Sequence, residues 1–320
     1  MRKQFLIWLS GLLGLAGCVN SEGGSGPDNQ FGGGHGQWQP VEPFEEFVAA
    51  GTVFPINGGS ILGTGRLGEL GNGNTHCPTD PRITNKIDCK DVIVVTGDRR
   101  QLVSRGLDGS PGNDRSDLLD ASADGRTILL RSHSSNLVAR DSNSLQDVFV
   151  WHDGVVMRAN LGEEDQEDWQ VQGSAWPGPH SCVAWCGTAS LSDDGRYVVF
   201  TSWDDGLVIS DGNGRPDVFL RDLQQNSTRL ISRNANGTVG NDASYLAPYP
   251  SASISADGSI VVFASHATNL AQSQHIACPE RDDYLKFATS GCPVAYEWVD
   301  GVVRPLGDGT ELQHLARVDQ

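Results

Sequence analysis

One segment of this chain occurs in three versions, and this repetition constrains the fold more than any other feature of the sequence. The versions are "SADGRTILLRSHSSNLV" from Ser122, "SDDGRYVVFTSWDDGLV" from Ser192 and "SADGSIVVFASHATNLA" from Ser255. Each has an Asp-Gly pair, which favours a tight turn because glycine adopts positive φ without steric cost, followed by β-branched and aromatic residues. The pattern predicts a hairpin turn and then a strand, three times over.

A second element follows each version of the first. It reads "DVFVWHDG" from Asp147 and "DVFLRDLQQNSTRL" from Asp217, with a shorter relative, "DVIVVTGDRRQLV", from Asp91. The segment "VAYEWVDGVVRPL" from Val294 has the same strand, turn, strand form but lacks the leading Asp. Short strands in units of four, with turns between them, are typical of a β-propeller. The sequence therefore predicts an all-β fold, a propeller of four-stranded blades in which about four blade units are visible.

The quoted repeats resemble the WD-like repeats of bacterial TolB-type propeller proteins from about Asp91 to Leu306. The resemblance implies blades that bind proteins or other components of the cell envelope. The turn glycines Gly125, Gly195 and Gly258 are 70 (195 − 125) and 63 (258 − 195) residues apart, so the blades carry loop insertions. A TolB-like ring has more than four blades, so we expect a truncated propeller or an open arc whose edge strands are exposed.

The first residues, "MRKQFLIWLSGLLGLAGC", have a basic start, an apolar run and small residues before a cysteine. The apolar run is too short to cross a bilayer, and this layout is typical of an export signal. Leu15 to Cys18 resembles the lipobox of bacterial lipoproteins, which implies that Cys18 is lipidated. We therefore expect a signal peptide at 1–17, the lipidated cysteine with a Gly-rich tether at 18–37, and the propeller domain at 38–320. Val19 follows the cysteine in place of the aspartate that resembles an inner-membrane retention signal of enteric bacteria. In a Gram-negative host this resemblance implies the outer membrane, facing the periplasm or the cell surface.

The formal net charge of the 320-residue chain is −17, which argues against a nucleic-acid partner because a negative surface repels phosphate. Besides Cys18 the chain has six cysteines. In an exported protein an even set predicts disulfides, and we expect sequential pairing, although other connectivities are open. An alternative is a zinc site at His180, Cys182 and Cys186, which lacks the usual second pair of ligands. The expected pairs are Cys77–Cys89, Cys182–Cys186 and Cys278–Cys292.

Two loops share the pattern D-x-N-x-x-x-D immediately before a strand. Oxygen ligands at alternate positions of a tight loop suit calcium, the cofactor that these loops suggest. The second loop also resembles part of the calcium loop of FG-GAP propeller repeats, but it is shorter. Asp and Asn also build turns by hydrogen-bonding backbone amides, so we interpret the loops as connections first and as calcium sites second. The candidate ligands are Asp141, Asn143 and Asp147 in one loop and Asp211, Asn213 and Asp217 in the other.

The sequence contains none of the linear motifs of hydrolases, zincins or nucleotide-binding proteins. His133 and His266 occupy equivalent places in two repeats, so a shared turn role explains them better than a catalytic pair. Trp151 and Trp298 lie on equivalent strands and are predicted to pack between blades. The remaining aromatic candidates are Trp169, Trp176 and Trp185, which lie in one insertion and are predicted to contact a partner.

These features favour a lipid-anchored envelope protein that binds or organises a protein partner without catalysis. Two alternatives stay open at this point: a propeller-based lyase or hydrolase that acts on glycans, and a fragment of a longer propeller. The enzyme alternative requires a polar pocket with titratable residues from different blades.

Overall fold

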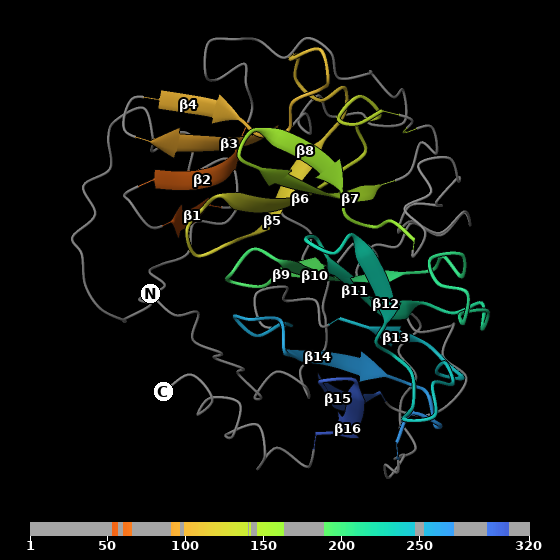
Figure 1. The fold of residues 1–320 in the computed structure, drawn as a ribbon. Helices are drawn as coiled ribbons and strands as arrows, with labels where there is room; N and C mark the ends of the chain where they lie inside the picture. The colour runs from red at the N-terminus through yellow and green to blue at the C-terminus, as the bar shows by residue number, and fades with distance from the viewer. Residues whose placement is uncertain are drawn as a thin grey trace, which may run out of the picture.

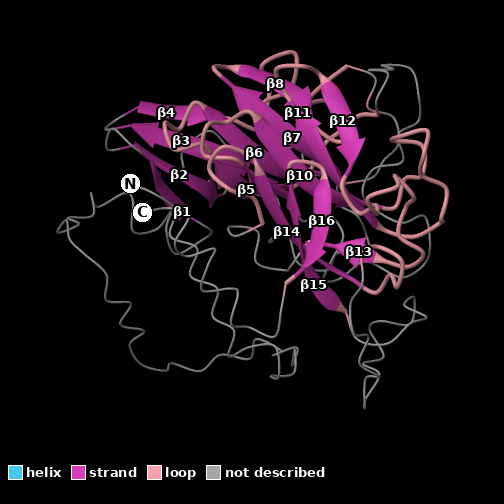
Figure 2. Cartoon of the chain, turned by 60° about the horizontal axis from the view of Figure 1, so that its bottom comes forward, coloured by secondary structure: helices cyan, strands magenta, loops and turns pink. Residues whose placement is uncertain are grey.

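The computed structural model describes residues 53–56, 60–65, 91–96, 99–139, 141, 146–162, 189–246, 253–271 and 293–306. The described ranges contain short strands and turns and no helix (Figures 1 and 2), so within them no helix is long and apolar enough to span a membrane. The strands are β1 (Val53–Ile56), β2 (Ser60–Gly65), β3 (Asp91–Thr96), β4 (Arg99–Leu102), β5 (Ser116–Ala121), β6 (Thr127–Ser132), β7 (Asp147–His152), β8 (Val155–Arg158), β9 (Ala189–Leu191), β10 (Tyr197–Ser202), β11 (Asp217–Asp222), β12 (Ser227–Leu230), β13 (Ser244–Tyr245), β14 (Ile260–Ser265), β15 (Val294–Val299) and β16 (Val302–Pro305).

The strands form four antiparallel sheets of four consecutive strands each, which we number as blades 1 to 4. Blade 1 is β1–β4, blade 2 is β5–β8, blade 3 is β9–β12 and blade 4 is β13–β16. The repeated hairpin and the second element pair in the same register in blades 2, 3 and 4, where Leu130, Phe200 and Phe263 lie opposite Phe149, Phe219 and Tyr296. The all-β, four-stranded blade architecture predicted from the repeats is confirmed.

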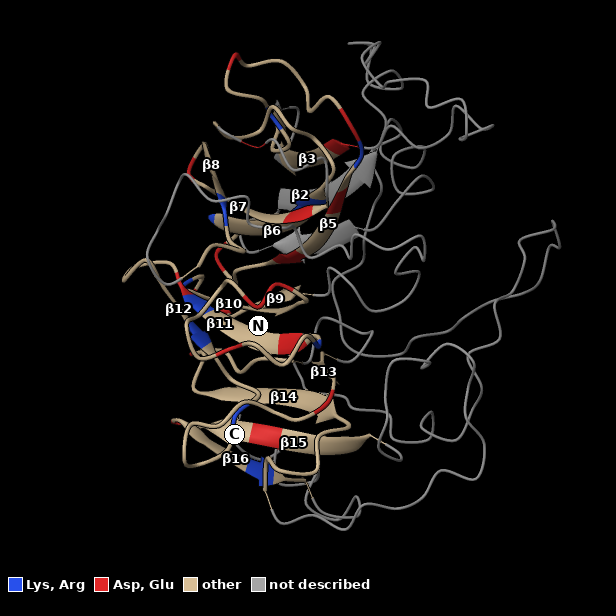
Figure 3. Cartoon of the chain, turned by 90° about the vertical axis from the view of Figure 1, so that its right-hand side faces the viewer, with Lys and Arg blue, Asp and Glu red and all other residues tan. Residues whose placement is uncertain are grey.

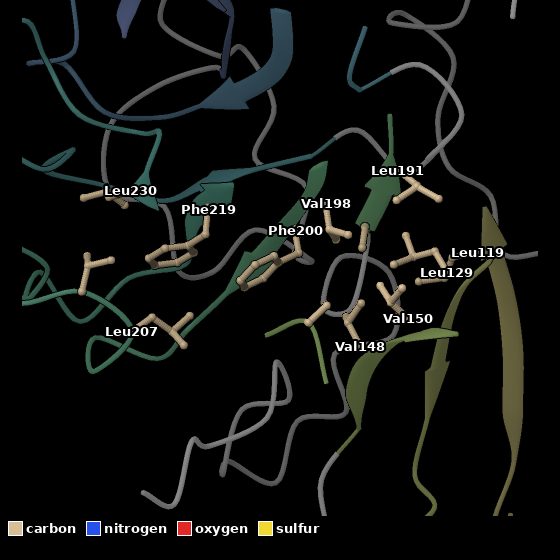
Figure 4. Packing of buried hydrophobic residues seen from close by; sticks show 13 residues of the cluster. Leu119, Leu129, Val148, Val150, Leu191, Val198, Phe200, Leu207, Phe219 and Leu230 are labelled. Atoms are coloured by element: carbon tan, nitrogen blue, oxygen red, sulfur yellow. The ribbon is translucent and has the colours of Figure 1, made fainter. Parts of the chain in front are cut away.

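The cores lie between blades, because alternate residues of a strand point to opposite faces of its sheet. We call the face that each blade turns towards the next blade in the chain its forward face, and the other its backward face. Leu129, Val148 and Val150 on the forward face of blade 2 pack against Val198, Phe200 and Phe219 on the backward face of blade 3 (Figure 4). Similar clusters join blade 1 to blade 2 and blade 3 to blade 4. Burial on both faces explains why these strands read as continuous apolar runs.

The Ser-x-Asp-Gly turns connect one blade to the next through their backbones. Ala123 N donates to Asp193 O at 2.9 Å, and Asp194 N donates to Ala256 O at 3.0 Å. The turn glycines approach the preceding blade so closely that a Cβ on Gly195 would lie 2.6 Å from Thr127 Oγ1. The same glycine has φ +74°, so the position excludes side chains for two separate reasons.

The four blades follow one another as an arc, with blade 1 and blade 4 at opposite ends of the stack (Figures 1 and 3). Blade 2 packs against blade 1 and blade 3, and blade 3 packs against blade 4. The described part of the chain is therefore an incomplete β-propeller.

Candidate functional site

A buried aspartate begins the third strand of blades 1, 2 and 3, and the structure gives it a structural partner in each. Asp91, Asp147 and Asp217 are all fully buried. The partner is Ser104 in blade 1, Asn160 in blade 2 and Ser232 in blade 3, and it lies just after the fourth strand of the same blade.

The geometry of these pairs is the same in all three blades. The partner side chain donates to the carboxylate and accepts from the backbone N–H of the residue that follows the aspartate. In blade 3, Ser232 Oγ donates to Asp217 Oδ1 at 2.5 Å and accepts from Val218 N at 3.0 Å. The arrangement satisfies a buried carboxylate and a backbone donor together, and it ties the start of the third strand to the end of the fourth. We call it the strand lock.

The acidic loop of blade 3 adds a second side chain to its strand lock. Asn213 Nδ2 donates to Asp217 Oδ2 at 2.6 Å and to Gly240 O at 2.8 Å. Asn213 Oδ1 accepts from Arg215 N at 2.7 Å, which fixes the turn. Both carboxylate oxygens of Asp217 therefore accept hydrogen bonds from protein donors. This loop joins β10 to β11, and its Asn213 side chain holds the start of β11.

Burial, and then the nearby carboxylates, raise the pKa of Asp217. Burial raises the pKa of Asp217 well above its usual range, and the charges of Asp211 and Asp205 raise it further. Burial, with the nearby Asp205 and Asp204, raises the pKa of Asp211 to about 6. Asp205 accepts from Gly214 N at 3.1 Å through Oδ2, while its buried Oδ1 atom has no hydrogen-bond partner among the described residues. The loop thus concentrates negative charge in a partly dehydrated place.

Asp204 and Asp205 are the members of this cluster that the loop pattern missed. They belong to the repeat "SWDDGLV", where the other two versions have "SHSSNLV" and "SHATNLA". Comparing the three versions position by position would have found them, because blade 3 alone has two acids there.

The described residues contain no group of three or more His, Cys, Asp or Glu side chains arranged to hold a metal ion. Asp141 and Asp147 of the first loop are described, and Asp147 accepts a hydrogen bond from Asn160 in its strand lock. Asn143 lies outside the described residues. Calcium binding by either loop stays a prediction.

An asparagine-based contact joins blade 1 to blade 2 and recurs between blade 3 and blade 4. Asn113 exchanges hydrogen bonds with Ser135, and its backbone N–H donates to Oδ1 of Asn136. Asn241 makes the same three bonds to Thr268 and Asn269. Asn136 and Asn269 correspond to Gly206 in blade 3, which has no side chain to accept this hydrogen bond. The same loop of blade 3 has the acids Asp204 and Asp205 instead.

One further buried acid joins two blades directly. Asp120 on β5 accepts from Ser190 Oγ at 3.0 Å and from Leu191 N at 2.9 Å, both on β9 of the next blade. The irregular register of β5 between Leu118 and Asp120 lets this side chain turn towards blade 3.

The two repeated histidines lie in different blades and have different surroundings. His133 is exposed in blade 2, although partial burial still lowers its pKa. His266 is buried in blade 4, where its Nε2 lies 3.3 Å from the hydroxyl of Tyr245. Trp151 and Trp298 are buried between blades, as predicted.

Several predicted features fall outside the described residues. They are the signal peptide, the tether, Cys18, the cysteines Cys77, Cys89, Cys182, Cys186, Cys278 and Cys292, and the tryptophans Trp169, Trp176 and Trp185.

No protein-family model and no curated protein matches this chain. Solved structures do show similarity. TolB from Acinetobacter baumannii aligns at 15% identity over 68% of this chain and 37% of its own, with a TM-score of 0.32. A putative TolB from Agrobacterium tumefaciens aligns at 14% identity over 78% of this chain and 61% of its own, with a TM-score of 0.36.

An acylaminoacyl peptidase from Pyrococcus horikoshii aligns at 13% identity over 82% of this chain and 28% of its own, with a TM-score of 0.40. This chain therefore spans less than two thirds of the length of each of these three proteins. Similarity at this level says nothing of activity, and the propeller assignment rests on the four sheets themselves.

Proposed function

We propose that this chain is a lipid-anchored, TolB-like propeller protein of the bacterial cell envelope that binds or organises a protein partner and performs no catalysis. The observation that carries the proposal is the use of the repeated polar residues. The strand-lock aspartates bond to a side chain just after the fourth strand of their own blade, and Asp120 bonds to the next blade. The Ser and Asp side chains of the Ser-x-Asp-Gly turns bond to each other and fix those turns. Such a framework holds its surface loops in fixed positions, which suits recognition of a partner.

The first test concerns the anchor and the place of action. Cells that express the full chain are labelled with a radioactive fatty acid, alongside a Cys18→Ser variant. We expect label in the membrane-bound wild type and none in the variant. Label in both chains, or a wild type that is unlabelled and free in the periplasm, would show that Cys18 is not the anchor.

The second test concerns binding against catalysis. The full chain is crosslinked in intact cells, and the crosslinked products are identified, while the purified chain is incubated with a panel of envelope glycans. We expect a reproducible crosslink to one envelope protein and no glycan turnover. Turnover would replace the binding role with the enzyme alternative, and the absence of any protein crosslink would remove the support for a partner.

A further inference from the structure

The forward face of blade 4 differs from the forward faces of blades 2 and 3. At equivalent positions blade 2 has Leu129, Val148 and Val150, and blade 3 has Val199, Val218 and Leu220, all of them buried. Blade 4 has Val262, Ala295 and Glu297, and all three are only half buried. An apolar side chain at the centre of the interface has become a carboxylate, so this face suits a contact that keeps its charges paired.

The alternation of burial along the strands of blade 4 confirms which residues make up this face. Val261 and Phe263 point towards blade 3 and are buried, while Ile260, Val262 and Ala264, which alternate with them along β14, are half buried. On β15 the same alternation leaves Glu297 and Val299 on the forward side. We call this set of half-buried residues, with Val302 and Arg304 on β16, the terminal face.

The terminal face carries one acid and one base at adjacent positions. Glu297 and Arg304 lie opposite each other on β15 and β16, whose charged residues are coloured in Figure 3. No ion pair within the described residues involves either side chain. The face is therefore locally neutral in a chain of formal net charge −17. A purely basic partner would meet repulsion from Arg304, whereas a surface with one acid and one base would match both charges.

The equivalent arginine of blade 3 shows how this position contacts a facing sheet. Arg229 takes the place in blade 3 that Arg304 has in blade 4, and its guanidinium lies 4.9 Å from the ring centre of Trp298 on the next blade. A forward-facing arginine on the fourth strand thus already forms part of one sheet-to-sheet contact in this molecule. Arg304 has the same orientation on blade 4, and among the described residues no blade packs against it.

We propose that the terminal face binds a second copy of this chain, face to face, about a two-fold axis that lies between the two sheets. This symmetry sets Glu297 of each copy near Arg304 of the other, so that both charges are paired twice. Val262, Val299 and Val302 supply the apolar surface around the pairs. The inference does not rest on the proposed partner role, because self-association and partner binding use separate evidence.

The size of one blade face limits the strength of this contact. Stable interfaces bury about 1,200 to 2,000 Å² in total, and a single four-stranded face offers less. We therefore expect a reversible dimer with a dissociation constant on the order of 10 to 100 μM. The long-range repulsion between two acidic chains is screened within about 8 Å at physiological salt, so the dimer should be tighter there than at very low salt.

The test is sedimentation velocity on the purified mature chain over a concentration series, with Glu297→Arg, Arg304→Glu and a control, Gln225→Arg. Gln225 is exposed on the β11–β12 turn, so the control changes charge away from the terminal face. We expect the wild type and the control to dimerise, and each face variant to lose affinity by about tenfold or more. Mixing the two face variants in equal amounts should restore a dimer, because each places its charges opposite complementary ones.

The mixing experiment also guards against misfolded variants, since two unfolded chains would not rescue each other. A wild type that stays monomeric at every concentration overturns the proposal. So does a dimer that both face variants leave unchanged, or an open-ended series of larger oligomers, which would indicate a head-to-tail contact. None of these outcomes would affect the crosslinking result on which the partner role depends.

Discussion

Blades 3 and 4 hold the start of their third strand in different ways. Blade 3 has the strand lock of Asp217 with Ser232, whereas blade 4 begins that strand with Val294, which packs against the core between the two blades. In the sequence, the residue at the position that Ser232 has in blade 3 is Gly307, which has no hydroxyl. Both halves of the lock are absent from blade 4 together, which is the pattern of a paired structural contact rather than of two independent sites.

The largest effect should come from removing the lock where it exists. Asp217→Ala leaves Ser232 Oγ and Asn213 Nδ2 without their buried acceptor and opens a cavity, so we expect a loss of about 3 kcal/mol in the free energy of unfolding. Val294→Ala in blade 4 removes only part of a half-buried apolar side chain and should cost about 1 kcal/mol. Urea denaturation of both variants measures the difference, and equal losses would contradict a special role for the aspartate.

The second comparison is between two turn glycines with positive φ: Gly258, which is crowded by a neighbouring blade, and Gly301, which has open space around it. A Cβ on Gly258 would lie 2.2 Å from the Tyr197 ring of blade 3, and φ is +75°. Gly301 has φ +92° but meets nothing within 4 Å. We expect Gly258→Ala to cost about 2 kcal/mol and Gly301→Ala about 1 kcal/mol, measured by thermal unfolding. A Gly258→Ala variant no worse than Gly301→Ala would show that the turns do not pack against the preceding blade.

The third comparison separates the two interpretations of the acidic loop. The pKa of Asp211 is raised to about 6, so its negative charge costs stability as pH rises from about 4 through 6, and the cost is complete above that. Asp211→Asn should therefore stabilise the protein at pH 8 by about 1 kcal/mol, discounted because the side chain is half exposed, and have no effect at pH 4.

The control for this prediction is to repeat the stability measurement on the wild type and on Asp211→Asn in calcium and in EGTA. If the loop binds calcium, the wild type gains stability when calcium replaces EGTA, and Asp211→Asn loses that gain. If the loop is only a connection, calcium leaves both midpoints unchanged, and the pH-dependent gain of the variant persists.

The smallest expected difference is between the two ion pairs that the equivalent arginines Arg196 and Arg126 form, one with the buried Asp222 and one with the exposed Asp153. Burial alone would raise the pKa of Asp222, but hydrogen bonds from Arg196 and from the N–H groups of Gln224 and Gln225 hold it below its usual value. Its stabilisation is therefore present above about pH 4 and is lost as pH falls through the lowered pKa. We expect Asp222→Asn to cost about 0.5 to 1 kcal/mol at pH 7 and Asp153→Asn, whose pair with Arg126 is exposed, to leave the melting temperature unchanged.

The sequence was sufficient to predict the blades because their repeats combine turn residues and strand residues at fixed spacing. It was also sufficient to place Trp151 and Trp298 in the core, since both recur on one strand of the unit. It did not predict that Asp217 bonds to Ser232, because the two residues meet only when a hairpin folds back on itself. Nor did it predict the inter-blade role of Asp120, which depends on an irregular register that no local pattern encodes.

The most direct test of the strand lock is a double-mutant cycle of Asp217→Ala and Ser232→Ala, measured by urea unfolding in EGTA. With metal removed, a structural pair still couples the two positions. We predict a coupling energy of about 1 kcal/mol or more between them. Additive effects, with coupling below about 0.3 kcal/mol, would contradict the account and assign Asp217 a role that does not depend on its hydroxyl partner.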